Sequence, residues 1–178
     1  LYSYGPESTF ESMSVQAVAD AIEQLGNHRI TITGGEPLLQ ETAVIELIDE
    51  LTRRNHRYDF NIETNGTIIP SFHRDNVWFT YDYKTPSSLA EDTMNLDIFK
   101  VATPADIIKF VVGSMQDLDR MDEILKTYPT EAQVFVSSVW GNIEGATIVD
   151  YMKAHDWQNV RFQLQIHKFI WDPNAKGV

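Results

Sequence analysis

Strand-like and helix-like segments alternate along this chain, and that alternation constrains its fold more than any other feature. Short runs rich in β-branched and aromatic residues predict strands at residues 29–34, 58–64, 77–84, 107–113, 133–139 and 160–166. Apolar residues at helical spacing predict helices over residues 15–25, 44–51, 118–128 and, more weakly, 143–154. Ser114 is expected to cap the third helix, and residues 85–106 carry no strong helical pattern. Such alternation predicts parallel strands joined by right-handed crossovers.

Several of the predicted strands are apolar on one face only. A parallel strand that is covered on both faces should be apolar on both. The polar members of the alternation include Asn61, Glu63, Lys109, Gln163, Gln165 and His167. One face can therefore pack under helices, while the other face is expected to line a site for a polar ligand.

These patterns predict an α/β fold, namely a partial (β/α)6 TIM-like barrel of mainly parallel strands. No repeat, low-complexity tract or Pro/Gly/Ser-rich linker divides the sequence, so we expect a single domain over residues 1–178. The alternative is an open antiparallel sheet with one wet face, and the intervening helices argue against it.

Charge and composition narrow the classes of partner. Fourteen Lys and Arg residues stand against twenty-six Asp and Glu residues, which gives a net charge of −12. An acidic surface does not suit a broad contact with a phosphate backbone, so we predict no direct nucleic-acid partner. No apolar run approaches the roughly 18–20 residues that span a bilayer, so we predict no membrane partner and a cytoplasmic location. The chain has no cysteine, and hence no thiolate that could hold an iron–sulfur cluster.

The stretch TITGGEPLLQ (31–40) joins the end of the first predicted strand to the next helix. Ligands of α/β folds bind at this carboxyl edge of the strands. Gly34 and Gly35 would let the backbone approach a ligand closely, and the carboxylate of Glu36 can accept hydrogen bonds from an ammonium group. The alternative for a bare Gly-Gly pair is a plain turn.

The whole run TGGEP resembles the motif with which radical SAM enzymes bind the amino group of S-adenosyl-L-methionine (SAM). Three later stretches extend the likeness to one branch of these enzymes, the 7-carboxy-7-deazaguanine synthases. They are NIETNGT (61–67), DYKTPSS (82–88) and the tail QLQIHKFIWDPNAKGV (163–178). Radical SAM enzymes in general share only the first motif, so the tail is the most discriminating of the four.

The resemblance implies a lyase of queuosine biosynthesis, a pathway of tRNA modification. Such an enzyme converts 6-carboxy-5,6,7,8-tetrahydropterin to 7-carboxy-7-deazaguanine with loss of ammonia. It implies SAM, a 4Fe–4S cluster and Mg²⁺ as cofactors, and flavodoxin or ferredoxin as the electron donor. The difficult chemistry then belongs to the cofactor, while the protein supplies binding, orientation and exclusion of water.

The resemblance also implies roles for individual residues. We expect Gly34, Gly35 and Glu36 to bind the amino group of SAM. Contacts with SAM or the edge of its site are expected from Glu63, Asn65, Lys84 and Ser87. The alternatives are a strand-end turn for Glu63 and Asn65, a solvated Lys84, and ordinary loop chemistry for Ser87.

Substrate contacts are expected on the polar strand faces and in the tail. The edge of a pterin would be hydrogen-bonded by Gln163, Gln165 and His167, and its carboxylate would be contacted by Lys109. The alternatives are a structural histidine and an ion pair between Lys109 and a neighbouring acid. Phe169 and Trp171 are expected to pack rather than to stack on a ligand, and no role is assigned to the other histidines.

The sequence departs from the family at the cluster. The resemblance implies that the cluster ligands, the first barrel strand and the Mg²⁺-binding hydroxyl lie upstream of Leu1, and no catalytic residue or metal ligand is assigned within the chain. Without that strand, residues 29–34 would form an exposed, aggregation-prone edge. Two other functions stay open, a cluster-less SAM- or pterin-binding module and a radical SAM activating enzyme. A homodimer is compatible with the sequence.

Overall fold

The computed structural model describes residues 11–173 and residue 175. Its strands are β1 (Arg29–Ile32), β2 (Asp59–Thr64), β3 (Val77–Tyr83), β4 (Ile107–Val112), β5 (Gln133–Ser138) and β6 (Val160–Phe162). They form one six-stranded sheet in chain order, and each strand pairs with the next in parallel. The predicted α/β fold of parallel strands is confirmed, and the alternative of an antiparallel sheet is wrong.

The helices fall where the apolar spacing predicted them. The longer ones are α1 (Val15–Leu25), α2 (Glu41–Arg54), α4 (Met115–Thr127) and α5 (Gly145–Ala154). The Ser114 hydroxyl accepts a hydrogen bond from the Asp117 backbone N–H at 3.2 Å, so Ser114 caps α4 as predicted. Residues 85–106 hold only short turns of helix, which are η2 (Pro86–Ser88), η3 (Glu91–Thr93) and α3 (Ile98–Val101).

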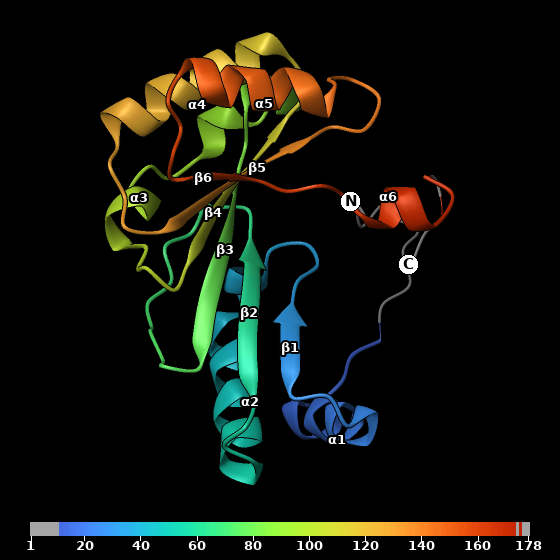
Figure 1. Ribbon diagram of the computed structural model, residues 1–178. Helices are drawn as coiled ribbons and strands as arrows, with labels where there is room; N and C mark the ends of the chain where they lie inside the picture. The colour runs from blue at the N-terminus through green and yellow to red at the C-terminus, as the bar shows by residue number, and fades with distance from the viewer. Residues whose placement is uncertain (1–10, 174, 176–178) are drawn as a thin grey trace.

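The chain order of the strands determines where the helices lie. Right-handed crossovers between neighbouring parallel strands place all connecting helices on one face of the sheet. Figure 1 shows the result, a strongly twisted sheet with α2 beside the early strands and α4 next to α5 beyond the later ones. The arrangement is that of a partial TIM-like barrel, whose inner face carries no helix.

The hydrophobic core lies between the sheet and these helices. Phe60, Phe79 and Phe110 point outward from the sheet and are fully buried. They belong to the same core cluster as Leu51 of α2 and Leu118 of α4. Burying each such side chain contributes about 1.5–3 kcal/mol, so this layer holds the strands in register.

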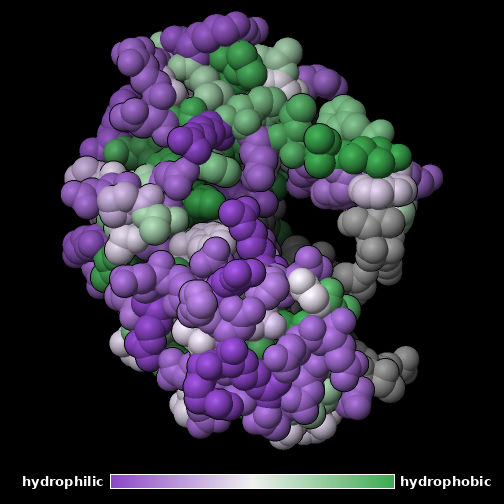
Figure 2. All heavy atoms as spheres, turned by 60° about the horizontal axis from the view of Figure 1, so that its bottom comes forward, coloured by the Kyte–Doolittle hydropathy of each residue, from purple (hydrophilic) through white to green (hydrophobic). Residues whose placement is uncertain are grey.

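The inner face of the sheet is polar and partly open to solvent. Asn61, Lys109 and Phe135 are half-buried there, and Glu63 is exposed. Figure 2, which brings the lower end of the view in Figure 1 forward, shows that the surface at that end of the molecule is mostly hydrophilic. The alternation of polar and apolar strand positions therefore separates a ligand-accessible face from the core.

One predicted strand is wrong in its second half. Residues 160–166 were expected to be extended, but β6 ends at Phe162. Among residues 11–173 and 175, β6 pairs with β5 alone, and beyond it the Gln163 backbone N–H donates to the Val136 carbonyl at 2.8 Å. The chain then leaves the sheet and forms the short helix α6 (His167–Ile170). The polar and apolar residues continue to alternate in the sequence after Phe162, but alternation alone does not show where pairing with the neighbouring strand ends.

The tail that follows β6 carries several exposed apolar side chains. They are Leu164, Ile166, Phe169, Ile170 and Trp171. Phe169 packs against Trp140 with its ring centroid 5.2 Å away, as expected of a packing residue. Within residues 11–173 and 175, no helix is long and apolar enough to cross a membrane.

Candidate functional site

The first part of the site is the turn that follows β1. Gly34 and Gly35 have φ values of 94° and 53°, and both are exposed. L-amino acids with a side chain rarely adopt such values, so the sequence requires glycine here. The turn leads directly into η1 (Pro37–Gln40), and Pro37 occupies a first-turn position that needs no N–H donor.

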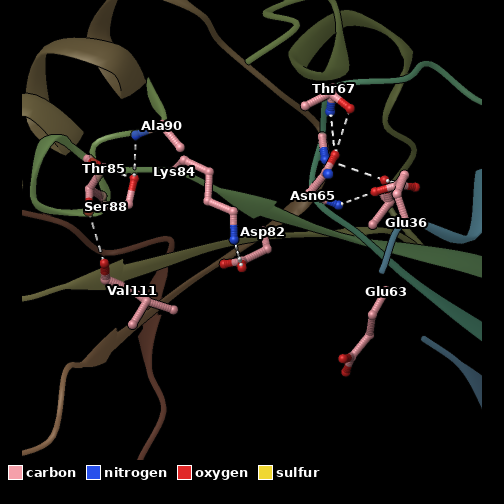
Figure 3. Close-up of polar contacts among 12 residues, drawn as sticks. Glu36, Glu63, Asn65, Thr67, Asp82, Lys84, Thr85, Ser88, Ala90 and Val111 are labelled. Carbon is pink, nitrogen blue, oxygen red and sulfur yellow. Dashed lines mark hydrogen bonds and ion pairs between the residues drawn. The ribbon is translucent and has the colours of Figure 1, made fainter. Parts of the chain in front are cut away.

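Glu36 is the buried acid of this turn, with 8% of its surface exposed. Its Oε1 accepts hydrogen bonds from the Leu38 backbone N–H at 3.0 Å and from the Thr64 hydroxyl at 2.8 Å. Its Oε2 accepts from the Asn65 backbone N–H at 2.7 Å. Figure 3 shows Glu36 reaching from the turn to the end of β2. The carboxylate therefore joins the carboxyl ends of β1 and β2.

Glu63 and Asn65 lie at the end of β2 but point to different surroundings. Within the described residues, the exposed carboxylate of Glu63 accepts one long hydrogen bond of 3.5 Å, from the Thr33 hydroxyl. Figure 3 shows this side chain extended away from Glu36. Asn65 Oδ1 accepts from the Thr67 backbone N–H at 3.0 Å and from its hydroxyl at 2.7 Å. Glu63 is thus available to a ligand, while half of the Asn65 amide holds a turn.

Lys84 follows β3 and forms an ion pair with Asp82, two residues earlier. Both side chains are only partly exposed, and Figure 3 shows them facing each other. The alternative of a solvated Lys84 is therefore wrong. Asp82 neutralises the ammonium group, so a ligand near Lys84 would face an ion pair rather than an isolated positive charge.

Ser87 lies in η2 and is held by the start of α4. Its backbone N–H donates to Asp117 Oδ1 at 2.9 Å, and its hydroxyl lies 3.3 Å from that of Ser114. Asp117 Oδ2 also accepts from the Gly113 backbone N–H at 2.7 Å. Burial by itself would raise the pKa of Asp117, but these hydrogen bonds to the ionised form outweigh it and lower the pKa.

The lowered pKa of Asp117 predicts a specific loss of stability in acid. A depressed pKa stabilises the fold at pH values above the ordinary value of 3.8, and this contribution disappears as the pH falls through the folded-state pKa. We expect Asp117→Asn to lower the free energy of unfolding by about 1–3 kcal/mol at neutral pH, because its amino group would face the Gly113 N–H. Urea unfolding at about pH 7 and about pH 3 should show the gap to wild type narrowing in acid. A gap that stays constant would contradict this assignment.

Lys109 lies in the middle of the inner face, in register with Asp82 on one side and Phe135 on the other. It is half-buried, and no hydrogen bond or ion pair of its ammonium group occurs within the described residues. The alternative of an ion pair with a neighbouring acid is therefore wrong, since Asp82 pairs with Lys84 instead.

Gln163, Gln165 and His167 do not share a strand face, which corrects the geometry expected for them. Gln163 follows β6 directly, Gln165 lies in the irregular stretch, and His167 begins α6. Gln163 is exposed, whereas Gln165 and His167 are half-buried. Among the described residues, no hydrogen bond joins any two of these three side chains.

Sequence reasoning missed the residues that hold the site together. Asp117 completes the pattern Ser-x-x-Asp with Ser114, which is the capping-box signature of a helix start and could have been found. Thr64 donates to Glu36, which is distant in the sequence, and Asp82 pairs with Lys84, two residues later. No sequence signal marks either role.

Comparisons with known proteins agree with this geometry. No family model matches the chain. It is 37% identical over 171 residues to the 7-carboxy-7-deazaguanine synthase of Clostridium acetobutylicum, over 93% of this chain and 76% of that protein. The enzyme of the same name from Leptospira interrogans is 34% identical over 190 residues, which cover 99% of this chain and 78% of that protein.

Solved structures confirm the fold. QueE from Escherichia coli superposes with a TM-score of 0.58 at 21% identity, over 86% of this chain and 64% of that one. A radical SAM methyltransferase from Sphaerobacter thermophilus gives a TM-score of 0.56 at 13% identity, over 85% of this chain and 56% of that one. Because both sequence relatives are more than 30% identical over most of their length, this chain belongs to the family of 7-carboxy-7-deazaguanine synthases.

Proposed function

We propose that this chain is the SAM- and substrate-binding part of a radical SAM carbon–nitrogen lyase of queuosine biosynthesis. The reaction converts 6-carboxy-5,6,7,8-tetrahydropterin to 7-carboxy-7-deazaguanine with release of ammonia. The observation that carries the proposal is the 37% identity to a 7-carboxy-7-deazaguanine synthase over nearly the whole chain. A cluster-less SAM- or pterin-binding module is the second candidate, and the residues proposed below for the two ligands would serve it equally.

The turn after β1 fits the amino-acid end of SAM. Gly34 and Gly35 are exposed and carry no side chain of their own, so an ammonium group can approach their backbone carbonyls closely. Glu36 has about four acceptor positions on its carboxylate, and three are taken by Leu38, Thr64 and Asn65. Its role is therefore mainly to position the turn and to add negative charge near the ammonium group.

The remaining residues serve the two ligands from neighbouring strands. Glu63 and Asn65 are proposed for the SAM ribose, and Lys84 and Ser87 for the loop edge of its site. Lys109, Gln163, Gln165 and His167 are proposed for the substrate. When bound, SAM supplies the radical that takes a hydrogen atom from the pterin, while these residues orient the ligands and exclude water.

The residues of this chain do not fit the metal cofactors of the family. The sequence has no cysteine, and the described residues contain no group of three or more His, Cys, Asp or Glu side chains that could hold an ion. The 4Fe–4S cluster and Mg²⁺ belong to the proposal through the family alone, and no step is assigned to either. The same holds for flavodoxin or ferredoxin as electron donor, for a homodimer and for a cytoplasmic location.

Binding of SAM to the 178-residue chain tests the proposed site directly. We expect calorimetric titration to give one SAM site per chain, with S-adenosylhomocysteine as a competitor. Gly34→Ala should weaken binding at least tenfold, because a φ of 94° is strained for alanine and the turn must shift. Gly26→Ala, at the end of α1 with φ 70°, is the matched control and should leave SAM affinity unchanged. Equal SAM affinities of the two variants would argue against the site.

Turnover of the full-length protein, purified and assayed without oxygen, tests the reaction. 6-Carboxy-5,6,7,8-tetrahydropterin should give 7-carboxy-7-deazaguanine and one equivalent of ammonia only when SAM and a one-electron reductant are both present. Cleavage of SAM without this product would point to another substrate.

A further inference from the structure

A row of three residues crosses the inner face of the last three strands. Lys109 of β4 is in register with Phe135 of β5, and Phe135 is in register with Arg161 of β6. Alternation along each strand places all three on the face opposite the core, where Phe110 and Val136 are buried. The row therefore sets an aromatic ring between two cations.

Neither cation of this row has an acidic partner in the part of the chain that the structure describes. Fourteen basic residues share the chain with twenty-six acidic ones, so a basic side chain near the surface should easily find a carboxylate. Among the ion pairs of the described residues, however, none includes Lys109 or Arg161. The acid beside Lys109, Asp82, is paired with Lys84. This part of the inner face keeps an excess of positive charge.

Arg161 is held in one orientation although it is exposed. Its Nη1 donates to Gln133 Oε1 at 2.8 Å, and its guanidinium carbon lies 5.8 Å from the centre of the Phe135 ring. Guanidinium has five N–H donors, so most of them remain for a ligand. A planar fork fixed in this way suits a carboxylate, which it can bind through two parallel hydrogen bonds.

Ser137, two residues after Phe135 in β5, supplies a second observation. Ser137 is on the same face as Phe135, is 1% exposed, and its hydroxyl has no hydrogen-bond partner within the described residues. Buried hydroxyl groups are rarely left unpaired in proteins, and an exception calls for an explanation such as a ligand or water. The orphan hydroxyl adjoins the row on the side of the carboxyl ends of the strands.

We propose that Arg161 is the carboxylate-binding residue of the substrate site and that Lys109, Phe135 and Arg161 together select a flat, carboxylated ring. Neighbouring strands lie about 4.8 Å apart, so Lys109 and Arg161 arise roughly 10 Å apart and can meet opposite ends of a two-ring ligand above Phe135. This inference rests on the proposed function. It extends that proposal by adding Arg161, whose guanidinium can bind a carboxylate through two parallel hydrogen bonds, whereas the ammonium group of Lys109 acts as a point charge.

The test compares two stable ligands, 6-carboxypterin and pterin, which differ only in the carboxylate. We expect Arg161→Gln in the 178-residue chain to weaken binding of 6-carboxypterin at least tenfold, measured by the fluorescence of the ligand, and to leave pterin binding unchanged. Phe135→Leu should weaken both ligands equally, by roughly threefold to tenfold, because a stacking surface is lost. Arg57→Gln, an exposed arginine outside the sheet, is the matched control.

The outcomes separate this inference from the proposed function. If the unchanged chain binds SAM and Arg161→Gln still holds 6-carboxypterin at wild-type affinity, the inference is wrong and the SAM site stands. If the unchanged chain binds neither SAM nor 6-carboxypterin, the proposed function fails and this inference fails with it. Should Arg161→Gln not fold, Arg161→Lys keeps the charge without the fork, and an unchanged preference for 6-carboxypterin over pterin would overturn the role of Arg161.

Discussion

Replacing Glu36 by alanine should lower the free energy of unfolding by about 4 kcal/mol and remove SAM binding. Three donors lose their acceptor at once, namely the Leu38 and Asn65 backbone N–H groups and the Thr64 hydroxyl. A hydrogen bond to a charged group contributes about 1.5–3 kcal/mol, and the contributions of neighbouring bonds do not simply add. Domains of this size have about 5–15 kcal/mol in total, so the loss should be evident in urea unfolding.

Glu63 offers a matched control for Glu36. Both are glutamates at the carboxyl edge of the first two strands, but Glu63 is exposed, and its one hydrogen bond among the described residues is long, at 3.5 Å. We expect Glu63→Ala to change the free energy of unfolding by less than about 0.5 kcal/mol. If the proposed ribose contact is correct, the same variant should still weaken SAM binding. Comparable stabilities of the Glu36 and Glu63 variants would show that the buried carboxylate does not hold the turn.

The conservative variant Glu36→Gln separates the two oxygens. A glutamine oxygen in place of Oε1 can still accept from Leu38 and Thr64, but its amino group would then face the Asn65 N–H. We expect its stability to lie between those of wild type and Glu36→Ala. A glutamine variant as unstable as the alanine variant would mean that the charge, rather than the two bonds at Oε1, carries the effect.

Local patterns made the layers of this fold predictable from the sequence. Six β-branched or aromatic runs became the six strands, and the spacing of Val44, Ile48 and Leu51 marked the buried side of α2. The capping role of Ser114 was predictable because it depends on residues three positions apart. Each of these signals is contained within a few residues of the chain.

The parts that were not predictable depend on distant residues. The alternation after Phe162 predicted a longer strand, but the length of a strand depends on the strands that pair with it, and in the described part of the chain β6 pairs with β5 alone. Glu36 looked like a ligand-binding acid, yet two of its three hydrogen bonds come from Thr64 and Asn65, which no spacing rule relates to position 36. The candidate Ser87 looked like a loop residue, and only the folded chain brings it to Asp117.

The second large effect is expected at the opposite end of the sheet, from Asp106→Ala. Asp106 is 1% exposed and directly precedes β4. Its Oδ1 accepts from the Phe79 backbone N–H at 2.7 Å, and its Oδ2 accepts from the Thr103 N–H and hydroxyl at 2.7 and 2.8 Å. Pairing between β3 and β4 begins at Thr80, so the Asp106 side chain supplies the acceptor that the Phe79 N–H would otherwise lack.

Losing this carboxylate should lower the free energy of unfolding by about 3–4 kcal/mol, because it leaves buried backbone donors without a partner. The control is Asp75→Ala, at an exposed loop aspartate, which should change the free energy of unfolding by less than about 0.5 kcal/mol.

In barrels of this type the amino ends of the strands serve stability and the carboxyl ends serve ligands. Folded Asp106→Ala, measured by calorimetry at low temperature, should therefore bind SAM as wild type does, whereas Glu36→Ala should lose both stability and binding. A loss of SAM affinity in folded Asp106→Ala would show that the two ends of this barrel are energetically coupled.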